Sequence, residues 1–205
     1  MGLQWKPQNR FGFPKMIEQT LEDKILDGFV HAFNESGPSF TLSEIASYLH
    51  ISKKTIYTIF ESKTDIYETL LRKTMKEIHD AQKKVFEDPN LNTREKLLKI
   101  LTIRTSSEDR LDVSRLFTVE KAEPVFYQHL LKAYETQWDY FSDLVAIGKK
   151  DGTLKSDTSA PFLIGMIAKS YEMLYEGDFL ARNHMTYTEA VVKIAKTVLS
   201  GVYAN

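Results

Sequence analysis

Residues 41–60, TLSEIASYLHISKKTIYTIF, contain two short helical patterns separated by a tight turn. Thr41 and Glu44 have the spacing of a capping box, which predicts the start of the first helix. Ser52 is a residue type that caps helices, so it predicts the start of the second. The apolar residues that would close one helix on the other are Ile45, Leu49, Ile51, Ile56 and Ile59. Helix, tight turn and helix in this order are typical of a helix-turn-helix unit.

The turn and the start of the second helix carry further information. His50 stands where the chain would adopt a positive φ, a conformation in which Gly is commonest and His is enriched among the other residues. Ala46 is small and would allow the two helices to approach closely. Lys53 and Lys54 fall in the first turn of a helix, where the positive end of the helix dipole disfavours cations. This placement indicates a negatively charged partner.

The rest of the chain has the same helical character. An apolar residue recurs every four positions from Ile17 to Phe33, and Gly37 and Pro38 end this helix. No segment shows the alternation of a strand, so the sequence predicts an all-α protein. Further helices are expected near residues 63–88, 93–106, 111–122, 124–149, 159–181 and 186–203.

Composition limits the classes of function. The 205 residues include no cysteine and carry a net charge of −1, so a nucleic-acid surface would have to be a local patch. No apolar run is long enough to span a membrane, and the N-terminus lacks the pattern of a signal peptide. Residues 1–13 are expected to form a basic arm. Together these features predict a cytoplasmic protein with no membrane partner.

Residues 17–72 resemble the DNA-binding domain of tetracycline-repressor-type (TetR-family) regulators. The matching stretches are HAFNESG, TLSEIA, ISKKTIYTIF and ESKTDIYETLL, with Tyr57, Phe60 and Lys63 in the family's spacing. The resemblance implies a helix-turn-helix DNA-binding domain over 14–62. It also implies a helical ligand-binding and dimerisation domain over 63–205, joined by a connecting helix at 63–88.

The resemblance also implies what the protein does and with which partners. It would be a homodimeric transcriptional repressor that binds double-stranded DNA sequence-specifically at a near-palindromic operator. A small-molecule effector would release it from the operator. DNA phosphate would then be the negative partner of the two lysines. The residues expected at the DNA are Thr41, Ser43, Ser52, Lys53, Lys54, Thr55, Tyr57, Thr58 and Lys63.

The C-terminal half is rich in aromatic residues, which are expected to be core residues in most cases. The resemblance adds a ligand cavity between the helices. Its candidate lining residues are Arg104, Glu120, Tyr134, Trp138, Phe162 and Met166. Apolar stripes on the last two helices could form a dimer interface or face their own core. The stripes consist of Phe162, Gly165, Met166, Lys169 and Met173, and of Val191, Ile194, Ala195, Val198 and Val202.

Two other classes of function stay open at the level of sequence. One is a helical adaptor that has lost DNA binding and acts through a protein partner. The other is a helical enzyme, although no phosphate-binding glycine loop, nucleophile elbow or HExxH motif is present. The five histidines show no metal-ligand spacing. We therefore expect neither catalysis nor a cofactor.

Overall fold

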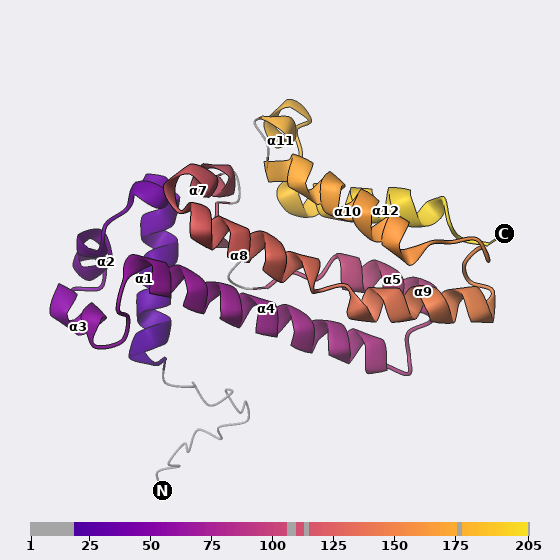
Figure 1. The fold of residues 1–205 in the computed structure, drawn as a ribbon, viewed down its shortest axis with the longest axis horizontal. Helices are drawn as coiled ribbons and strands as arrows, with labels where there is room; N and C mark the ends of the chain where they lie inside the picture. Colours follow the sequence, from indigo (N-terminus) through magenta and orange to yellow (C-terminus); the bar gives the residue numbers. More distant parts are fainter. Residues whose placement is uncertain (1–18, 106–109, 113–114, 176–177, 205) are drawn as a thin grey trace, which may run out of the picture.

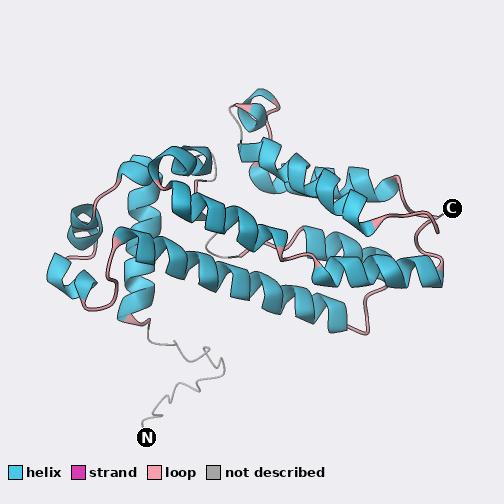
Figure 2. Cartoon of the chain, in the orientation of Figure 1, coloured by secondary structure: helices cyan, strands magenta, loops and turns pink. Residues whose placement is uncertain are grey.

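The computed structural model describes residues 19–105, 110–112, 115–175 and 178–204, and within these ranges its regular structure is helical. Figure 2 shows helices joined by loops in these ranges. One isolated antiparallel bridge, between Leu154 and Tyr203, is the exception. The all-α prediction is confirmed. The predicted basic arm at 1–13 lies outside the described residues. No helix in the described ranges is long and apolar enough to cross a membrane.

Four short elements form the N-terminal end of the molecule (Figure 1). They are α1 (Leu21–Ser36), the 3-10 helix η1 (Gly37–Ser39), α2 (Leu42–Tyr48) and α3 (Lys53–Tyr57). The predicted capping box is present, because Thr41 and Glu44 bond each other's backbone N–H. The Ser52 side chain accepts from the Thr55 N–H, and His50 has a φ of 54°. Helix α3 ends at Tyr57, whereas the sequence pattern predicted an end near Phe60.

The helix-turn-helix closes around fully buried aliphatic side chains. Ile45 of α2 and Ile56 of α3 have no exposed surface and pack on Phe29 of α1. The close crossing of α1 and α2 occurs at Gly28, where an added Cβ would lie 3.0 Å from Ile45 Cγ2. The sequence pattern pointed to Ala46 for the approach of α2 to α3, and Ala46 is buried.

The remaining helices form an elongated bundle. They are α4 (Lys63–Glu87), α5 (Thr93–Leu101), α7 (Leu116–Ala122), α8 (Pro124–Glu135), α9 (Asp139–Asp151), α10 (Ala160–Glu172), the 3-10 helix η3 (Met173–Tyr175), α11 (Phe179–Arg182) and α12 (Tyr187–Ser200). Helix α4 runs from the N-terminal unit along the bundle, with α8 and α9 beside it, and α10 and α12 form a further layer (Figure 1).

Several predicted helices are wrong in extent. The helix expected over 111–122 begins at Leu116, and the apolar pattern from Ile17 belongs to a helix that begins at Leu21. The segment 124–149 is two helices, because the chain breaks at residues 136–138, where the Gln137 carbonyl accepts from the Gln82 amide of α4. Helix α5 ends at Leu101, whose carbonyl accepts from the Tyr171 hydroxyl at 2.8 Å. The segment 159–181 divides into α10, η3 and α11. The first two interruptions coincide with hydrogen bonds from distant helices, which a local pattern does not contain.

Candidate DNA-binding surface and bundle cavity

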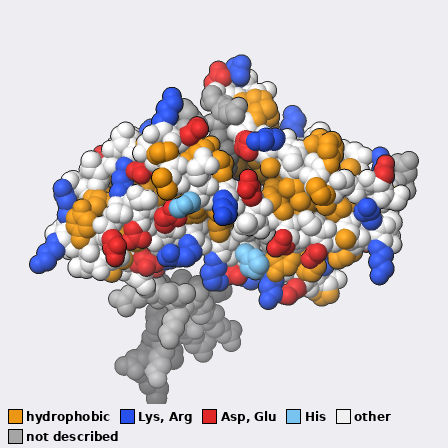
Figure 3. Space-filling view, in the orientation of Figure 1, with side chains coloured by type: hydrophobic (Ala, Val, Ile, Leu, Met, Phe, Trp, Pro, Cys, Tyr) orange, Lys and Arg blue, Asp and Glu red, His pale blue; other side chains and the backbone are white. Residues whose placement is uncertain are grey.

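The surface formed by α2 and α3 displays most of the residues predicted to contact DNA. Lys53 and Lys54 are exposed on α3, and Tyr57 exposes 56% of its surface. Ser43 and Thr58 are exposed too, whereas Thr55 is half-buried. Lys and Arg side chains project from this end of the molecule (Figure 3). The buried face of α3 is fixed by Ile56, so the exposed face is held rigidly.

The hydroxyl groups of this surface also hold the helix ends. Thr41 Oγ1 donates to Glu44, and this capping box lowers the pKa of the Glu44 carboxyl through the hydrogen bonds it accepts from Thr41 and Ser36. Ser52 Oγ lies 2.9 Å from Thr55 Oγ1. Thr58 Oγ1 donates to the Thr55 carbonyl at 2.6 Å. Each of these groups therefore has a local structural role whether or not it contacts a ligand.

Lys63 is placed differently from the other predicted DNA contacts. Its ammonium donates to the Pro38 carbonyl, lies 3.5 Å from Glu123 Oε1 and sits 4.4 Å from the centre of the Phe40 ring. Only 25% of its side chain is exposed. Glu123 stands between α7 and α8, so this contact joins the start of α4 to the bundle.

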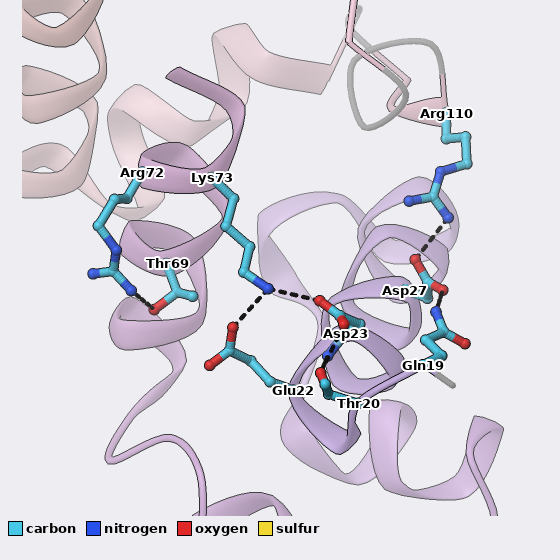
Figure 4. Close-up of polar contacts among 9 residues, drawn as sticks. All are labelled: Gln19, Thr20, Glu22, Asp23, Asp27, Thr69, Arg72, Lys73 and Arg110. Atoms are coloured by element: carbon cyan, nitrogen blue, oxygen red, sulfur yellow. Dashed lines mark hydrogen bonds and ion pairs between the residues drawn. The ribbon is translucent and has the colours of Figure 1, made fainter. Parts of the chain in front are cut away.

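Polar contacts fasten α1 to the rest of the molecule (Figure 4). Lys73 of α4 lies 2.6 Å from carboxylate oxygens of both Glu22 and Asp23, and Arg110 lies 2.7 Å from Asp27. The hydrogen bond from Lys73 lowers the pKa of the Asp23 carboxyl, and the bond to Asp23 raises the pKa of Lys73.

A second polar contact joins the side-chain amide of Asn34, near the end of α1, to residues 110–112. The amide donates to the Arg110 carbonyl at 2.7 Å and accepts from the Asp112 N–H at 2.8 Å. Two hydrogen bonds of opposite sense to one short segment fix both its position and its orientation. The N-terminal unit formed by α1, α2 and α3 therefore makes specific polar contacts with the rest of the chain on two sides.

A cavity of about 90 Å³ lies inside the bundle. Its walls come from α4, α5, the α8–α9 break, α10 and α12, together with the segment after α5. The lining residues are Ile78, Gln82, Ile100, Leu101, Ile103, Arg104, Tyr134, Gln137, Trp138, Tyr171, Tyr187 and Val191. The wall is predominantly apolar and aromatic, as ligand cavities generally are.

A few polar groups also line this cavity. The Arg104 guanidinium lies 4.5 Å from the centre of the Tyr187 ring. Burial raises the pKa of Tyr171 well above its usual range, so its hydroxyl stays protonated and donates to Leu101. Gln137 Oε1 is buried with no hydrogen-bond partner among the described residues. An unsatisfied buried acceptor costs about 1–3 kcal/mol, which a donor from a ligand would offset.

Three of the six predicted ligand residues reach this cavity: Arg104, Tyr134 and Trp138. Glu120 is exposed on α7, and Phe162 and Met166 are exposed on α10, so none of these three lines it. Sequence reasoning did not select Gln82, Gln137, Tyr171 or Tyr187 for the wall. Gln82 had a usable signal, because a polar residue stands on the apolar stripe of α4 beside Ile78.

The two predicted interface stripes differ in exposure. Phe162 and Met166 of α10 and Met173 of η3 are exposed, with Phe162 exposing 66% of its surface. On α12, Val191 and Ala195 are buried, so this stripe packs against its own core, which was the alternative interpretation. The exposed side of α12 is formed instead by Thr188, Glu189, Lys193, Lys196 and Thr197.

Metal-binding groups are not clustered. Among the described residues, no three His, Cys, Asp or Glu side chains are placed to hold one metal ion. Acidic and basic side chains are interspersed over the face seen in Figure 3. The features that stand out are therefore the α2–α3 surface and the bundle cavity.

Comparisons with known proteins agree with this arrangement. Residues 25–70 match the family model described as bacterial regulatory proteins, tetR family. The chain is 20% identical over 185 residues to the helix-turn-helix-type transcriptional regulator YvaF of Bacillus subtilis, covering 90% of this chain and 97% of YvaF.

Solved structures resemble the whole fold. The fatty acid degradation regulator FadR from Bacillus halodurans matches with a TM-score of 0.66 at 20% identity, over 87% of this chain and 98% of FadR. FadR from Bacillus subtilis, solved in complex with stearoyl-CoA, matches with a TM-score of 0.63 at 18% identity, over 87% and 97% of the two chains. The helix-turn-helix and the family match identify residues 25–70 as similar to the DNA-binding domain of the tetR family of bacterial regulatory proteins, and the chain as a whole shares the fold of these regulators.

Proposed function

We propose that the protein is a homodimeric transcriptional repressor that binds a near-palindromic operator and leaves it when a small molecule enters the bundle. The observation that carries this proposal is the rigid α2–α3 surface, with Lys53 and Lys54 exposed beside Tyr57. Its site of action would be the cytoplasm, where bacterial DNA lies. No catalytic step is part of the proposal.

On DNA, α3 would enter the major groove. Lys53 and Lys54 would reach phosphates or guanine edges, and Thr55 would contact a base edge or a thymine methyl group. Tyr57, Thr58, Ser43, Thr41 and Ser52 surround this contact and would bond phosphate oxygens. Two copies of α3 would meet successive major grooves, which requires a separation of about 34–36 Å or a related spacing.

Lys63 would contact a DNA phosphate only after its ammonium leaves Glu123. In the structure its charge faces Glu123 rather than solvent. A DNA phosphate near the start of α4 would compete with that carboxylate for the same ammonium. DNA binding would therefore loosen a contact between α4 and the α7–α8 junction.

The effector would act through the bundle cavity and the contacts that join the bundle to α1 and α4. A ligand shifts a conformational equilibrium only by its difference in affinity for the two states. The polar contacts of Asn34, Asp27 and Lys63 join the two units, so a different arrangement of the units would change these contacts and could transmit that difference. A coupling of about 1–3 kcal/mol is typical for such linkage.

The dimer would use the exposed apolar side chains of α10. Phe162 and Met166 are too exposed to contribute to the core of one protomer. An isologous interface around these residues would bury them against the same face of a second copy. Lys193 and Lys196 of α12 would lie toward the rim.

The test is selection of binding sequences from a random DNA pool with purified protein at near-physiological salt. We expect a near-palindrome, and the double variant Lys53→Ala/Lys54→Ala should recover none. The matched control is Lys149→Ala/Lys150→Ala, which removes two neighbouring exposed lysines from α9. A folded dimer that enriches no sequence would contradict the proposal and favour the adaptor function.

A further inference from the structure

Ile59 is an aliphatic residue of the helix-turn-helix that the core leaves partly uncovered. The sequence pattern assigned it to the contact between α2 and α3, together with Ile45 and Ile56. In the structure Ile45 and Ile56 have no exposed surface, whereas Ile59 exposes 40% of its surface. A single exposed apolar residue is ordinary on a protein surface, so the information lies in the position of Ile59.

Ile59 lies one helical turn after Thr55. Just beyond the end of α3, the Phe60 N–H still donates to the Ile56 carbonyl at 3.0 Å, which is the spacing of an α-helix. Residues four positions apart are neighbours on one side of a helical turn, so Ile59 follows Thr55 along the same edge. Ile56 and Phe60 are buried and hold this turn against the core.

The charges near Ile59 indicate the class of molecule that would cover it. Both charged residues of α3, Lys53 and Lys54, are exposed lysines. Residues 25–70, which include Ile59, are also the part of the chain that matches the tetR family of regulators. An exposed aliphatic group beside two cations fits a polyanion that carries an apolar group. DNA is such a molecule, because its bases include thymine.

The side chain of isoleucine can recognise only apolar groups on DNA. It has no hydrogen-bond donor or acceptor, so it cannot bond a phosphate or the polar atoms of a base edge. In the major groove, the apolar group that distinguishes one base from the others is the C5-methyl of thymine. Burial of one methyl group in such a contact should raise the affinity about fourfold.

We infer that Ile59 is a specificity-determining residue that reads one thymine methyl group in each half-site of the operator. This assignment rests on the proposed function and deepens it, since it names a base group that the protein selects. One helical turn advances about 5.4 Å, and successive base pairs are about 3.4 Å apart. The thymine should therefore lie within about two base pairs of the base that Thr55 contacts.

The experiment replaces single thymines of the selected operator by deoxyuridine, which lacks only the C5-methyl group. Fluorescence anisotropy at one salt concentration measures the affinity of the full chain for each substituted duplex. We expect one thymine in each half-site at which the replacement weakens wild-type binding about fourfold. With Ile59→Ala, the same replacement should leave the affinity unchanged.

The matched control is Ile147→Ala. Ile147 exposes 43% of its surface, close to the value for Ile59, but it lies on α9 in the bundle. Ile147→Ala should keep the full wild-type response to deoxyuridine. Ile59→Val keeps part of the aliphatic surface and should keep part of the response. Thermal unfolding of each variant shows whether it is folded.

Three results would overturn the inference. They are an operator in which no single deoxyuridine weakens wild-type binding, a loss that persists in Ile59→Ala, and an equal effect of the two isoleucine substitutions. A persistent loss would assign the methyl contact to another side chain, such as Thr55. All three results require an operator that binds, so they leave the proposed repressor in place. A pool that enriches no sequence would instead remove the proposed function and this inference together.

Discussion

At the scale of single residues, Lys63 shows how one ammonium can serve two purposes. It balances Glu123 within the chain and stands at the start of α4, close to the surface proposed for DNA. Because the side chain is mostly covered, its transfer to a phosphate requires Glu123 to be left behind. Because of this competition, substitutions of Lys63 and of Glu123 should change the affinity for DNA in opposite directions.

Lys63→Ala should weaken binding to all DNA sequences alike and reduce the slope of log K against log salt by about one unit, since one counterion fewer is released. Glu123→Gln should strengthen binding, because Lys63 loses its internal competitor. Fluorescence anisotropy across a salt series measures both. Lys149→Ala on α9 is the control. An unchanged slope in Lys63→Ala would show that Lys63 stays with Glu123 on DNA.

Thr55 is the residue of α3 expected to select sequence. Thr55→Ala should change the preferred operator more than it changes nonspecific affinity, since base contacts specify and phosphate contacts position. Repeated selection from the random pool measures this.

Thr55 also bonds Ser52 within the chain, so the control is Ser52→Ala. It removes the same contact and the helix cap, at a cost of about 1 kcal/mol of stability, while keeping the Thr55 side chain. If both variants select the wild-type operator, Thr55 does not read the sequence.

At the scale of elements, the packing of α1 on α4 includes the ion pairs of Lys73 with Glu22 and Asp23. The lowered pKa of Asp23 means that its contribution is present above the ordinary carboxyl pKa and is lost as pH falls through the lowered value. The raised pKa of Lys73 means that its contribution is present below the ordinary lysine pKa and is lost as pH rises through the raised value.

Asp23→Asn should therefore lower the free energy of unfolding near pH 7 by about 0.2–1 kcal/mol, a range discounted for the exposure of the pair. Urea denaturation at a series of pH values measures it, and the difference from the wild type should shrink as the pH falls below 3.8, the ordinary carboxyl pKa. The same substitution in a Lys73→Met background should cost less, which isolates the pair. An equal cost in both backgrounds would assign the effect to the N-terminus of α1 instead.

At the scale of the whole molecule, the exposed apolar face of α10 is the feature that a single protomer leaves uncovered. Phe162→Asp should raise the dissociation constant of the dimer more than tenfold. It should leave the helix content unchanged, because the Phe162 side chain is not part of the core of its own protomer. Sedimentation velocity and circular dichroism measure the two quantities.

Val125→Asp is the matched control for Phe162→Asp, since Val125 exposes 68% of its surface on α8. It should leave the association unchanged. Equal association of the wild type and Phe162→Asp would place the interface elsewhere.

The sequence by itself determined the starts of α2 and α3, the all-α class and the resemblance of residues 25–70 to the tetR family. Thr41 and Ser52 cap helices as predicted, because a capping hydrogen bond joins residues two or three positions apart and depends only on the local sequence. The buried Ile45 and Ile56 follow equally from helical periodicity.

Only the tertiary structure decided which side chains meet across the bundle. The break at residues 136–138, the partners of Lys63 and the inward face of α12 depend on contacts between different elements of the fold, such as the contact of Gln82 with Gln137, 55 positions apart. Phe162 and Tyr187 are both aromatic residues on helices, yet one is exposed on α10 and the other lines the cavity. Helical periodicity gives the face of a residue on its own helix, and the packing of the helices decides whether that face meets core, cavity or solvent.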